Sequence, residues 1–277
     1  MKILISTDIE GIAGVFHSEQ TRAGNGEYER ARRWMTLEAN AAITGAFAGG
    51  ASEIWVNDSH GSYRNLLPDL LDPRARVILG KPRTLGMMAG LEFEPVLVFM
   101  IGYHAKAQSP GILAHTINSF AFARVLLDGA EVGEAGLYGA LAADYGAHVA
   151  LLTGDDAFIA ETRPAFPEVA CVTVKTASGQ VSGATLSPAH ACLEIERVAQ
   201  EAVARHVAAG TVRDTGRRAA KVATIELRAQ TAGLADLFCQ WPTAERVDAV
   251  TLRFQAPGIE HAVRMLNCFS AMSFMLR

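Results

Sequence analysis

Two carboxylates, Asp8 and Glu10, stand one residue apart at the end of an apolar run that begins at Ile3. In an extended segment, residues two apart point to the same side and lie about 6 to 7 Å from each other, so both side chains can face one cation. Two unpaired carboxylates at the rim of an apolar core would repel each other and lose hydration. A metal ion is the simplest group that compensates for this cost.

Three further loops carry an acid or an imidazole just after a predicted strand or hairpin. His60 lies in "NDSHG", His104 in "GYHAK" and Glu134 in "VGEAG", each just after a predicted strand or hairpin. In an open α/β sheet, ligands bind outside the carboxyl ends of the strands, so we expect these side chains at one edge of one sheet. Two imidazoles and three carboxylates suit zinc, manganese or cobalt. Five ligands exceed what one catalytic zinc takes from protein, which favours two ions that share a bridging carboxylate.

Each of these residues also has a structural interpretation. Asp8 and Asp58 could cap helices by accepting backbone N–H bonds, and for Asp58 we prefer this interpretation. The two histidines could be ordinary loop residues, and Glu134 could simply favour the positive end of its helix. Gly11 and Gly14 match half of a dinucleotide-binding fingerprint, but the third glycine is missing and two acids precede them. Helix capping explains the acids of "TGDD" as well as metal binding does.

The elements that must position these residues alternate along the chain. Short apolar runs predict strands, and longer periodic segments predict helices. The strands are expected at 2–7, 53–57, 96–101, 148–153 and 169–174, and the helices at 28–48, 134–145 and 156–163. This order predicts an α/β fold, with a mainly parallel sheet covered by helices on both faces. Asp128 and Gly129 stand where a tight hairpin turn requires them.

The last part of the chain has its own pattern. A helix is expected over 187–209, followed by an exposed connection and a β-α-β-α segment of about 60 residues. We therefore expect a metal-binding α/β catalytic domain at 1–210 and a smaller C-terminal β-α-β-α subdomain at 211–277, packed on the first.

Composition restricts the class of protein. The 277 residues carry a formal net charge of -4, with 50% hydrophobic and 19% charged residues. This balance argues against a nucleic-acid or anionic-membrane partner, because both favour clustered Lys and Arg. Arg30, Arg32 and Arg33 form a basic cluster that fits a solvated helix face. No apolar run reaches the ~18 residues of a membrane span, and the cysteines form no Cys-x-x-Cys pair. We expect a soluble cytoplasmic protein.

The chain resembles the zinc-dependent D-aminopeptidases of the dipeptide-permease operon type. The shared pieces occur in family order over almost the whole chain, and they are "STDIEGIAG", "YERARRWMTLEAN", "VNDSHG", "GYHAKAQSPGILAH", "VGEAGL", "GDD" and "LSP". The resemblance implies that two zinc ions are bound by Asp8, Glu10, His60, His104 and Glu134, with Asp8 as the bridge. It also implies that His115, in "ILAHT", is a catalytic residue close to the metals.

The same resemblance implies an oligomer and a class of substrate. The family forms a self-compartmentalised ring, a homodecamer whose active sites face a central channel and admit short peptides. Two positions depart from the family pattern, because Tyr138 stands where asparagine is expected and Gln180 where arginine is common. If these positions hold substrate, the substrate differs from the D-alanyl peptides typical of the family. Neither departure affects the metal ligands.

From these residues we expect an aminopeptidase that removes the N-terminal residue, a D-amino acid by resemblance, from short peptides. Paired metals would activate water, and His115 would protonate the leaving amine or stabilise the oxyanion. Two alternatives stay open. A dinuclear phosphoesterase would also use paired metals, although only Lys106 and Arg64 offer cations for a phosphate near the ligands. A noncatalytic, metal-stabilised ring protein would bind peptides without cleaving them.

Overall fold

The structure is a computed structural model that describes residues 1–166, 168–210 and 221–277. Its larger sheet has the strand order β3-β2-β1-β4-β7-β8-β9. The strands are β1 (Lys2–Thr7), β2 (Glu53–Asp58), β3 (Arg76–Ile78), β4 (Leu97–Ile101), β7 (His148–Asp155), β8 (Ala170–Gly179) and β9 (Ser182–Thr185). Every neighbouring pair is parallel except β8 and β9. This confirms the predicted α/β fold with a mainly parallel sheet.

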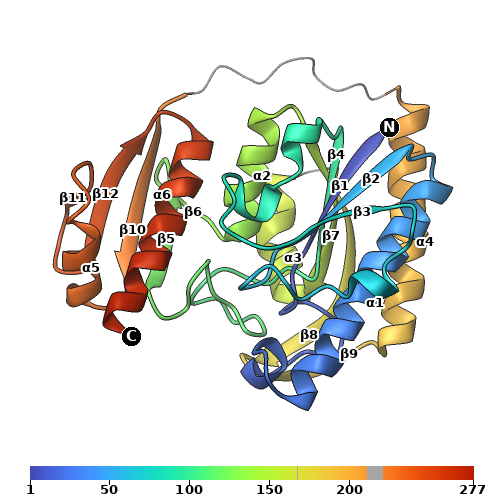
Figure 1. Cartoon of the computed structure of the whole chain (residues 1–277), viewed down its shortest axis with the longest axis horizontal. Helices are drawn as coiled ribbons and strands as arrows, with labels where there is room; N and C mark the ends of the chain where they lie inside the picture. The colour runs from blue at the N-terminus through green and yellow to red at the C-terminus, as the bar shows by residue number, and fades with distance from the viewer. Residues whose placement is uncertain (167, 211–220) are drawn as a thin grey trace.

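Helices cover both faces of this sheet (Figure 1). On one face lie α1 (Gly26–Ala48) and α4 (Pro188–Ala208), and on the other lie α2 (Glu134–Asp144) and α3 (Asp156–Thr162). Ile3 and Ile5 of β1 point into the first core, whereas Leu4 points into the second. A strand buried on both faces reads as a continuous apolar run, which explains why the first strand could be predicted.

A second sheet, wholly antiparallel, has the order β11-β12-β10-β5-β6. It contains β5 (Phe122–Leu127), β6 (Ala130–Glu131), β10 (Ala223–Ala229), β11 (Glu245–Arg246) and β12 (Thr251–Ala256), and it is accompanied by α5 (Ala232–Phe238) and α6 (Ile259–Met272). The expected hairpin turn is present between β5 and β6, with φ of 50° at Asp128 and 83° at Gly129. Because β5 pairs with β10, this sheet joins two distant parts of the chain.

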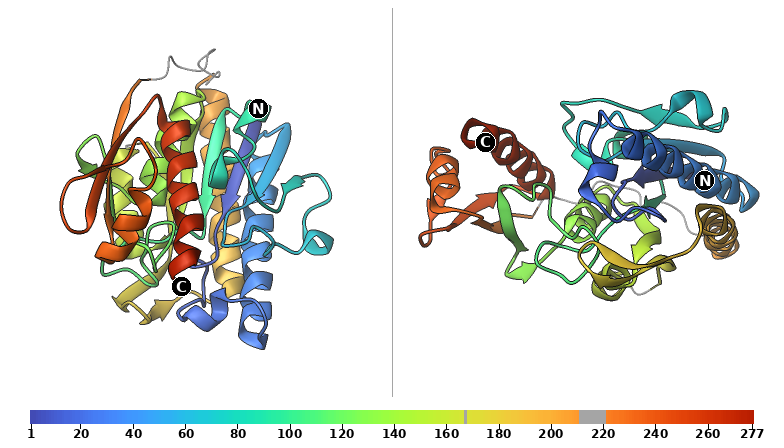
Figure 2. Two further views of the ribbon diagram at one scale, coloured as in Figure 1. Left: turned by 60° about the vertical axis from the view of Figure 1, so that its left-hand side comes forward. Right: turned by 90° about the horizontal axis from the view of Figure 1, so that it is seen from below.

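The two sheets are linked by α6, which packs against α2 and against a short 3-10 segment (Figures 1 and 2). The 3-10 segments are η1 (Ser18–Thr21), η2 (Pro68–Leu70), η3 (Gly86–Met88), η4 (Leu91–Phe93), η5 (Arg163–Ala165) and η6 (Ser273–Leu276). The domain boundary expected between 210 and 211 borders residues 211–220, which lie outside the described residues. Within the described ranges, no helix combines the length and apolar character needed to cross a bilayer.

Candidate metal centre

The candidate site lies at the carboxyl ends of the central strands. From β1 the chain continues to β2 and β3 on one side, and it later continues to β4 and β7 on the other. The direction in which successive strands are added to the sheet therefore reverses between β1 and β4. Such a switch point leaves a crevice at the carboxyl ends of these two strands. Asp8 and Glu10 follow β1, His60 follows β2, His104 follows β4, and Glu134 begins α2. The structure thus brings together the five residues that the sequence placed at one sheet edge.

A glycine allows the first two of these loops to touch. The N–H of Gly11 donates to the carbonyl oxygen of Gly102 at 2.7 Å. A Cβ at position 11 would lie 1.9 Å from the carbonyl oxygen of Tyr103, so no side chain fits there. This close approach of two backbones, which glycine permits, packs the segment that carries Asp8 against the segment that carries His104.

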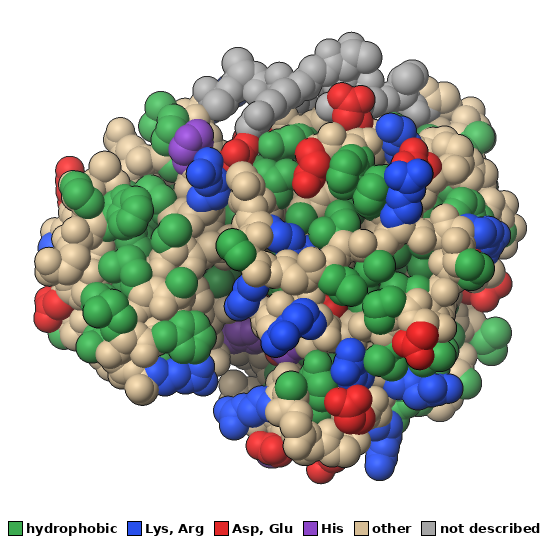
Figure 3. Space-filling model, viewed as in Figure 1, with side chains coloured by type: hydrophobic (Ala, Val, Ile, Leu, Met, Phe, Trp, Pro, Cys, Tyr) green, Lys and Arg blue, Asp and Glu red, His purple; other side chains and the backbone are tan. Residues whose placement is uncertain are grey.

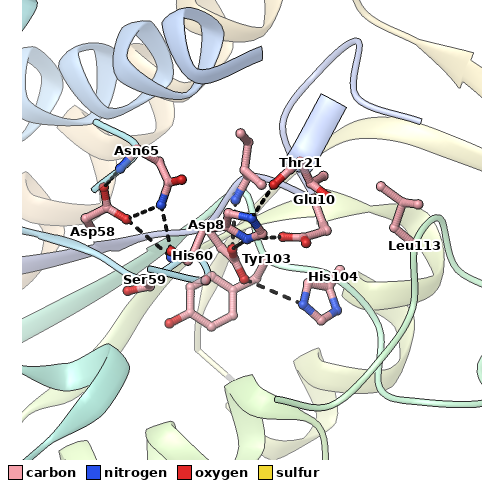
Figure 4. A network of polar contacts seen from close by, with 12 residues as sticks. Asp8, Glu10, Thr21, Asp58, Ser59, His60, Asn65, Tyr103, His104 and Leu113 are labelled. Atoms are coloured by element: carbon pink, nitrogen blue, oxygen red, sulfur yellow. Dashed lines mark hydrogen bonds and ion pairs between the residues drawn. The ribbon is translucent and has the colours of Figure 1, made fainter. Parts of the chain in front are cut away.

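The carboxylate of Asp8 lies between two imidazoles. Its Oδ1 is 3.2 Å from Nδ1 of His60, and its Oδ2 is 3.5 Å from Nε2 of His104. Oε2 of Glu10 is 3.0 Å from the same nitrogen of His60, and Oε2 of Glu134 is 3.5 Å from the same nitrogen of His104. The five residues therefore form two groups that share Asp8, and Figure 4 shows this carboxylate facing both imidazoles.

Each nearby imidazole places one nitrogen against a backbone carbonyl oxygen. These contacts are His60 Nε2 with Thr21 at 2.9 Å, His104 Nδ1 with Ala105 at 3.0 Å, and His115 Nδ1 with Leu113 at 2.9 Å. A neutral imidazole that donates to a carbonyl from one nitrogen presents the lone pair of the other. In all three residues that second nitrogen faces the carboxylates, which is the orientation that a metal ligand requires.

His115 lies beside His104. The two rings stack with centroids 4.1 Å apart and an interplanar angle of 10°. Nε2 of His115 is 3.9 Å from Oε1 of Glu134. The same oxygen accepts the N–H of Ile117 at 2.6 Å, which ties the loop that carries His115 to the first turn of α2. His115 is partly exposed and lines the adjacent cavity, so its imidazole can contact a bound molecule.

The electrostatics of the cluster favour positive charge. Asp8, Glu10, His104 and Glu134 are between 2% and 5% exposed. Burial and the Glu10 carboxylate raise the pKa of Asp8. Burial opposes the charged form of His60 and His104, yet the surrounding carboxylates raise the pKa of both imidazoles well above the usual range. A buried group of acids that attracts protons in this way will also attract a cation.

Two buried atoms indicate that a metal ion, and not only bound protons, compensates the charge of the carboxylates. Oε2 of Glu10 and Nε2 of His104 are buried, and their contacts with the facing imidazole and carboxylates do not have the geometry of hydrogen bonds. Buried polar atoms without partners are rare and point to an ion or a ligand. His104, His115 and Glu134 offer ligand atoms within 4.8 Å of one another, and so do Asp8, Glu10 and His104. This mixture of nitrogen and oxygen donors fits zinc, manganese or cobalt.

Asp58 supports the loop rather than the cluster. Its carboxylate accepts the backbone N–H groups of His60 at 3.3 Å, Asn65 at 2.5 Å and Leu66 at 2.7 Å. The preferred interpretation of Asp58 as a helix cap is wrong, because a loop and not a helix follows β2; its carboxylate accepts the backbone N–H groups of that loop instead. These bonds fix the turn that carries His60.

Asp155, in "TGDD", also accepts backbone bonds. It caps α3 by accepting the N–H of Phe158 at 2.7 Å, and its other oxygen accepts the N–H of Ile112 at 2.6 Å. The helix-capping interpretation of this motif is therefore confirmed. The bond to Ile112 also connects α3 to the loop that carries His115.

Sequence reasoning missed two buried charges behind the cluster. Lys175, on β8, donates from Nζ to the carbonyl oxygens of Glu10 at 2.5 Å and Val15 at 2.7 Å. Glu38, on α1, accepts the N–H of Ala13 at 2.8 Å. Both residues hold the loop after β1. A lysine directly after an apolar strand segment, and an acid among the alanines of a helix, are the sequence signals that could have found them.

A cavity of about 710 Å³ opens onto the cluster. One wall comes from the loops after β1 and β2 and from the segment before η3, and the other comes from α6 and η6. Residues on these walls include Tyr63, Lys81, Arg83, Asn267 and Arg277. Figure 3 shows the hollow between the two parts of the molecule, with His side chains visible inside it and Lys and Arg side chains around it.

The two positions that depart from the family pattern differ in their relation to this cavity. Tyr138 is 1% exposed and lines it, so a substitution here changes its wall. Gln180 has an exposed side chain, and its backbone carbonyl oxygen accepts the N–H of Leu113 at 2.8 Å. Lys106, one of the two cations considered for the phosphoesterase alternative, pairs with Glu161 at 3.1 Å.

Comparisons with known proteins agree with one another. Residues 1–268 match the family model described as D-aminopeptidase. The D-aminopeptidase of Bacillus subtilis (strain 168) is 36% identical over 191 residues, which are 69% of this chain and 69% of that protein. The solved structure of the Zn-dependent D-aminopeptidase DppA from Bacillus subtilis, described as a self-compartmentalizing protease, superposes with a TM-score of 0.89. It has 29% sequence identity, and the match covers 99% of this chain and 98% of that one.

Proposed function

The chain belongs to the D-aminopeptidase family of metal-dependent peptidases, and from this premise we propose that it releases the N-terminal D-amino acid from short peptides at a two-zinc centre. The observation that carries the proposal is the position of Asp8, whose two carboxylate oxygens face different imidazoles at 3.2 and 3.5 Å. A carboxylate in this position is suited to bridging two cations.

We infer two metal positions that share Asp8. Glu10 and His60 would complete the first, and His104 and Glu134 would complete the second. When bound, zinc supplies Lewis acidity, which polarises a carbonyl group and makes water nucleophilic near neutral pH. Oε2 of Glu10 and Nε2 of His104, which are buried without a hydrogen bond, support this assignment. Manganese or cobalt would fit the same donors.

His115 is proposed as the catalytic residue that moves a proton. Its Nδ1 is held by the carbonyl oxygen of Leu113 at 2.9 Å, so Nε2 faces the cluster and the cavity. As the peptide C–N bond breaks, the leaving amine needs a proton, and an imidazole can supply it. The bond from Ile117 to Glu134 keeps this ring beside the cluster while substrate binds.

The charge and size of the cavity fit an unblocked short peptide. The acidic residues among those that line it, Asp8, Glu10 and Glu134, all belong to the cluster. With metal bound, the free amine of a substrate could bind one metal or a carboxylate of the cluster. A volume of about 710 Å³ lies within the range of small-molecule pockets, so it admits a few residues in extended form but no folded protein.

Larger features of the protein stay predictions. The self-compartmentalizing description of DppA supports an oligomer, and a homodecameric ring is proposed on the family resemblance. The cytoplasmic location and the division into residues 1–210 and 211–277 are proposed from the sequence alone.

A direct assay tests this function. The purified protein is analysed for bound metal and incubated with matched D-alanyl and L-alanyl dipeptides, with and without a chelator. We expect release of D-alanine that the chelator abolishes and added zinc restores. Faster cleavage of the L-alanyl peptide would contradict the stereochemical assignment, and tight peptide binding without any product would favour the noncatalytic ring protein.

The phosphoesterase alternative needs its own comparison. Lys81 and Arg83 line the cavity and could meet a phosphate as well as a carboxylate. Parallel assays with a phosphate monoester and a D-alanyl anilide separate the two functions. We expect chelator-sensitive turnover of the anilide and none of the phosphate ester.

A further inference from the structure

The charges on the cavity wall are segregated. Among the described residues that line it, the only carboxylates belong to the metal cluster, and the remaining full charges are the cations Arg22, Lys81, Arg83 and Arg277. The chain as a whole is acidic, with a formal net charge of -4, so this local excess of cations is not a general property of its surface. Figure 3 shows Lys and Arg side chains around the hollow.

Arg83 is a partly buried cation held in a fixed orientation. Its guanidinium carbon lies 3.9 Å from the ring centroid of Tyr63. One terminal nitrogen donates to the carbonyl oxygen of Asp58 at 2.7 Å, and the other donates to the side chain of Asn57. Among the described residues no carboxylate lies within ion-pair distance of it, although the Asp58 and Glu92 carboxylates act on it from farther away. Its Nε is buried without an acceptor, and burial lowers the pKa of Arg83. A cation desolvated in this way gains from an anion that binds beside it.

Lys81 lies at the same aromatic ring. Its Nζ is 5.8 Å from the ring centroid of Tyr63 and donates to the carbonyl oxygen of Gly61 at 3.1 Å. Within the described parts of the chain it has no carboxylate partner either. Two cations that form no contact ion pair with a described residue therefore lie on one wall of the cavity, next to the ring of Tyr63.

Tyr63 connects this wall electrostatically to the metal centre. Burial raises the pKa of Tyr63 to about 12, with Arg83 acting against the shift and the Glu134 and Asp8 carboxylates adding to it. Tyr63 lines the same cavity as Lys81, Arg83 and the carboxylates of the cluster. The cavity presents carboxylates at one position and cations at another, with Tyr63 near both.

We propose that Lys81 and Arg83 form a subsite for the free C-terminal carboxylate of a short peptide whose amino terminus lies at the metal centre. An unblocked dipeptide or tripeptide whose amino terminus lies at the metal centre has a free carboxylate at its other end, and Lys81 and Arg83 offer that carboxylate two cations on one wall of the cavity. An arginine and a lysine together can give a carboxylate several charge-assisted hydrogen bonds. This inference rests on the proposed peptidase function, and it assigns two residues that would recognise the free carboxylate of the substrate.

The test compares two substrates that differ only at the far end. For the zinc-loaded enzyme, kcat/KM is measured with D-alanyl-D-alanine and with D-alanyl-D-alaninamide. Because hydrogen bonds to charged groups contribute on the order of tenfold to 100-fold in affinity, we expect the free acid to be preferred by about that factor. Lys81→Gln and Arg83→Gln should each lower kcat/KM for the acid by about tenfold, mainly through KM, and leave the amide nearly unchanged.

Controls separate charge at the subsite from other effects. Arg30→Gln removes one positive charge from an exposed position on α1 that does not line the cavity, and it should leave the ratio of acid to amide unchanged. If Arg83→Gln does not fold, Lys81→Gln and Arg83→Lys provide the same ratio. Chelator-sensitive cleavage of acid and amide with equal kcat/KM, unchanged in the variants, would overturn the subsite alone. No chelator-sensitive cleavage of either substrate would overturn the proposed function, and the subsite with it.

Discussion

The ammonium group of Lys175 lies 2.5 Å from the backbone carbonyl oxygen of Glu10, directly behind the candidate metal centre. The same nitrogen donates to the carbonyl oxygen of Val15 at 2.7 Å. Lys175 is 2% exposed, and burial lowers its pKa to about 8. A buried cation that bonds two carbonyls of one loop fixes the shape of that loop. Lys175 is therefore a positioning residue for Glu10.

Replacing Lys175 by methionine should loosen this loop. Lys175→Met keeps the length of the side chain but leaves two buried carbonyl groups without donors, so we expect a loss of about 1 to 3 kcal/mol in the free energy of unfolding. Zinc affinity should fall by about tenfold to 100-fold, because supports behind metal ligands act on that scale. Denaturant unfolding and zinc titration measure the two effects. Lys221→Met, at an exposed position, is the matched control, and unchanged zinc affinity in Lys175→Met would contradict the positioning role.

Asp8 and Glu10 should differ in what they hold. If Asp8 bridges, Asp8→Asn weakens both metal positions, whereas Glu10→Gln weakens only one. We expect Asp8→Asn to retain less metal than Glu10→Gln. Its kcat/KM should fall by at least about 100-fold, because loss of a direct ligand lowers activity more than loss of a supporting residue does. Metal analysis after dialysis gives the ratio of zinc to protein. Full metal content with full activity in Asp8→Asn would remove the bridge.

His115 should matter for turnover more than for metal binding. We expect His115→Ala to retain its zinc while kcat falls by about 100-fold to 10,000-fold, the range for loss of a general acid or base. Zinc content and kcat are measured on the same sample. Because His115 also lies within ligand distance of His104 and Glu134, loss of one zinc in this variant would instead identify it as a ligand. Normal turnover would exclude it from the mechanism.

Glu38 should make stability depend on pH. Burial raises its pKa from 4.5 to about 7, against the opposing effects of the Ala13 N–H and Lys175. Between these two values the folded protein binds more protons at Glu38 than the unfolded chain does, so the free energy of unfolding falls as pH rises through that window. The free energy of unfolding falls by roughly 3 kcal/mol in total as pH rises through this window, and below pH 4.5 Glu38 has no effect on it.

Substituting Glu38 tests this dependence. Glu38→Gln can still accept the N–H of Ala13 and has no charge to desolvate, so it should flatten the pH dependence of unfolding between about pH 5 and 7.5. Denaturant unfolding of the zinc-loaded protein across this range measures the slope. Glu27→Gln removes a charge from an exposed position of the same helix and should leave the slope unchanged. A slope in Glu38→Gln equal to that of the wild type would exclude Glu38 as its source.

The main sheet could be predicted because its strands carry local signals. Parallel strands buried on both faces read as short apolar runs, and the helices between them are long enough to show their periodicity. Strand β3 has three residues and β9 lies at an exposed edge, so neither gives such a signal. The pairing of β5 with β10 joins residues about a hundred positions apart, which no local pattern specifies.

The candidate site could be predicted only on the side that the main sheet builds. Asp8, Glu10, His60 and His104 each follow a strand. The carboxyl ends of parallel strands lie at one edge of the sheet, independent of the conformation of the loops between them. Arg83 reaches the cavity from the loop between β3 and η3, and Arg277 reaches it after η6, through packing of α6 against α2 and η3. Lys175 shows in the sequence as a lysine directly after an apolar strand segment, but the sequence does not specify which carbonyl groups lie opposite it.

The central claim is that a pair of metal ions sharing Asp8 carries out peptide hydrolysis. Zinc titration of the metal-stripped protein tests it most directly, with D-alanyl-D-alanine cleavage followed at each addition. We predict that activity is absent without metal and reaches its maximum at two zinc ions per chain, and that Asp8→Asn does not recover at the same ratio. Cleavage that needs no metal, or that is complete at one ion per chain, would contradict the two-metal account.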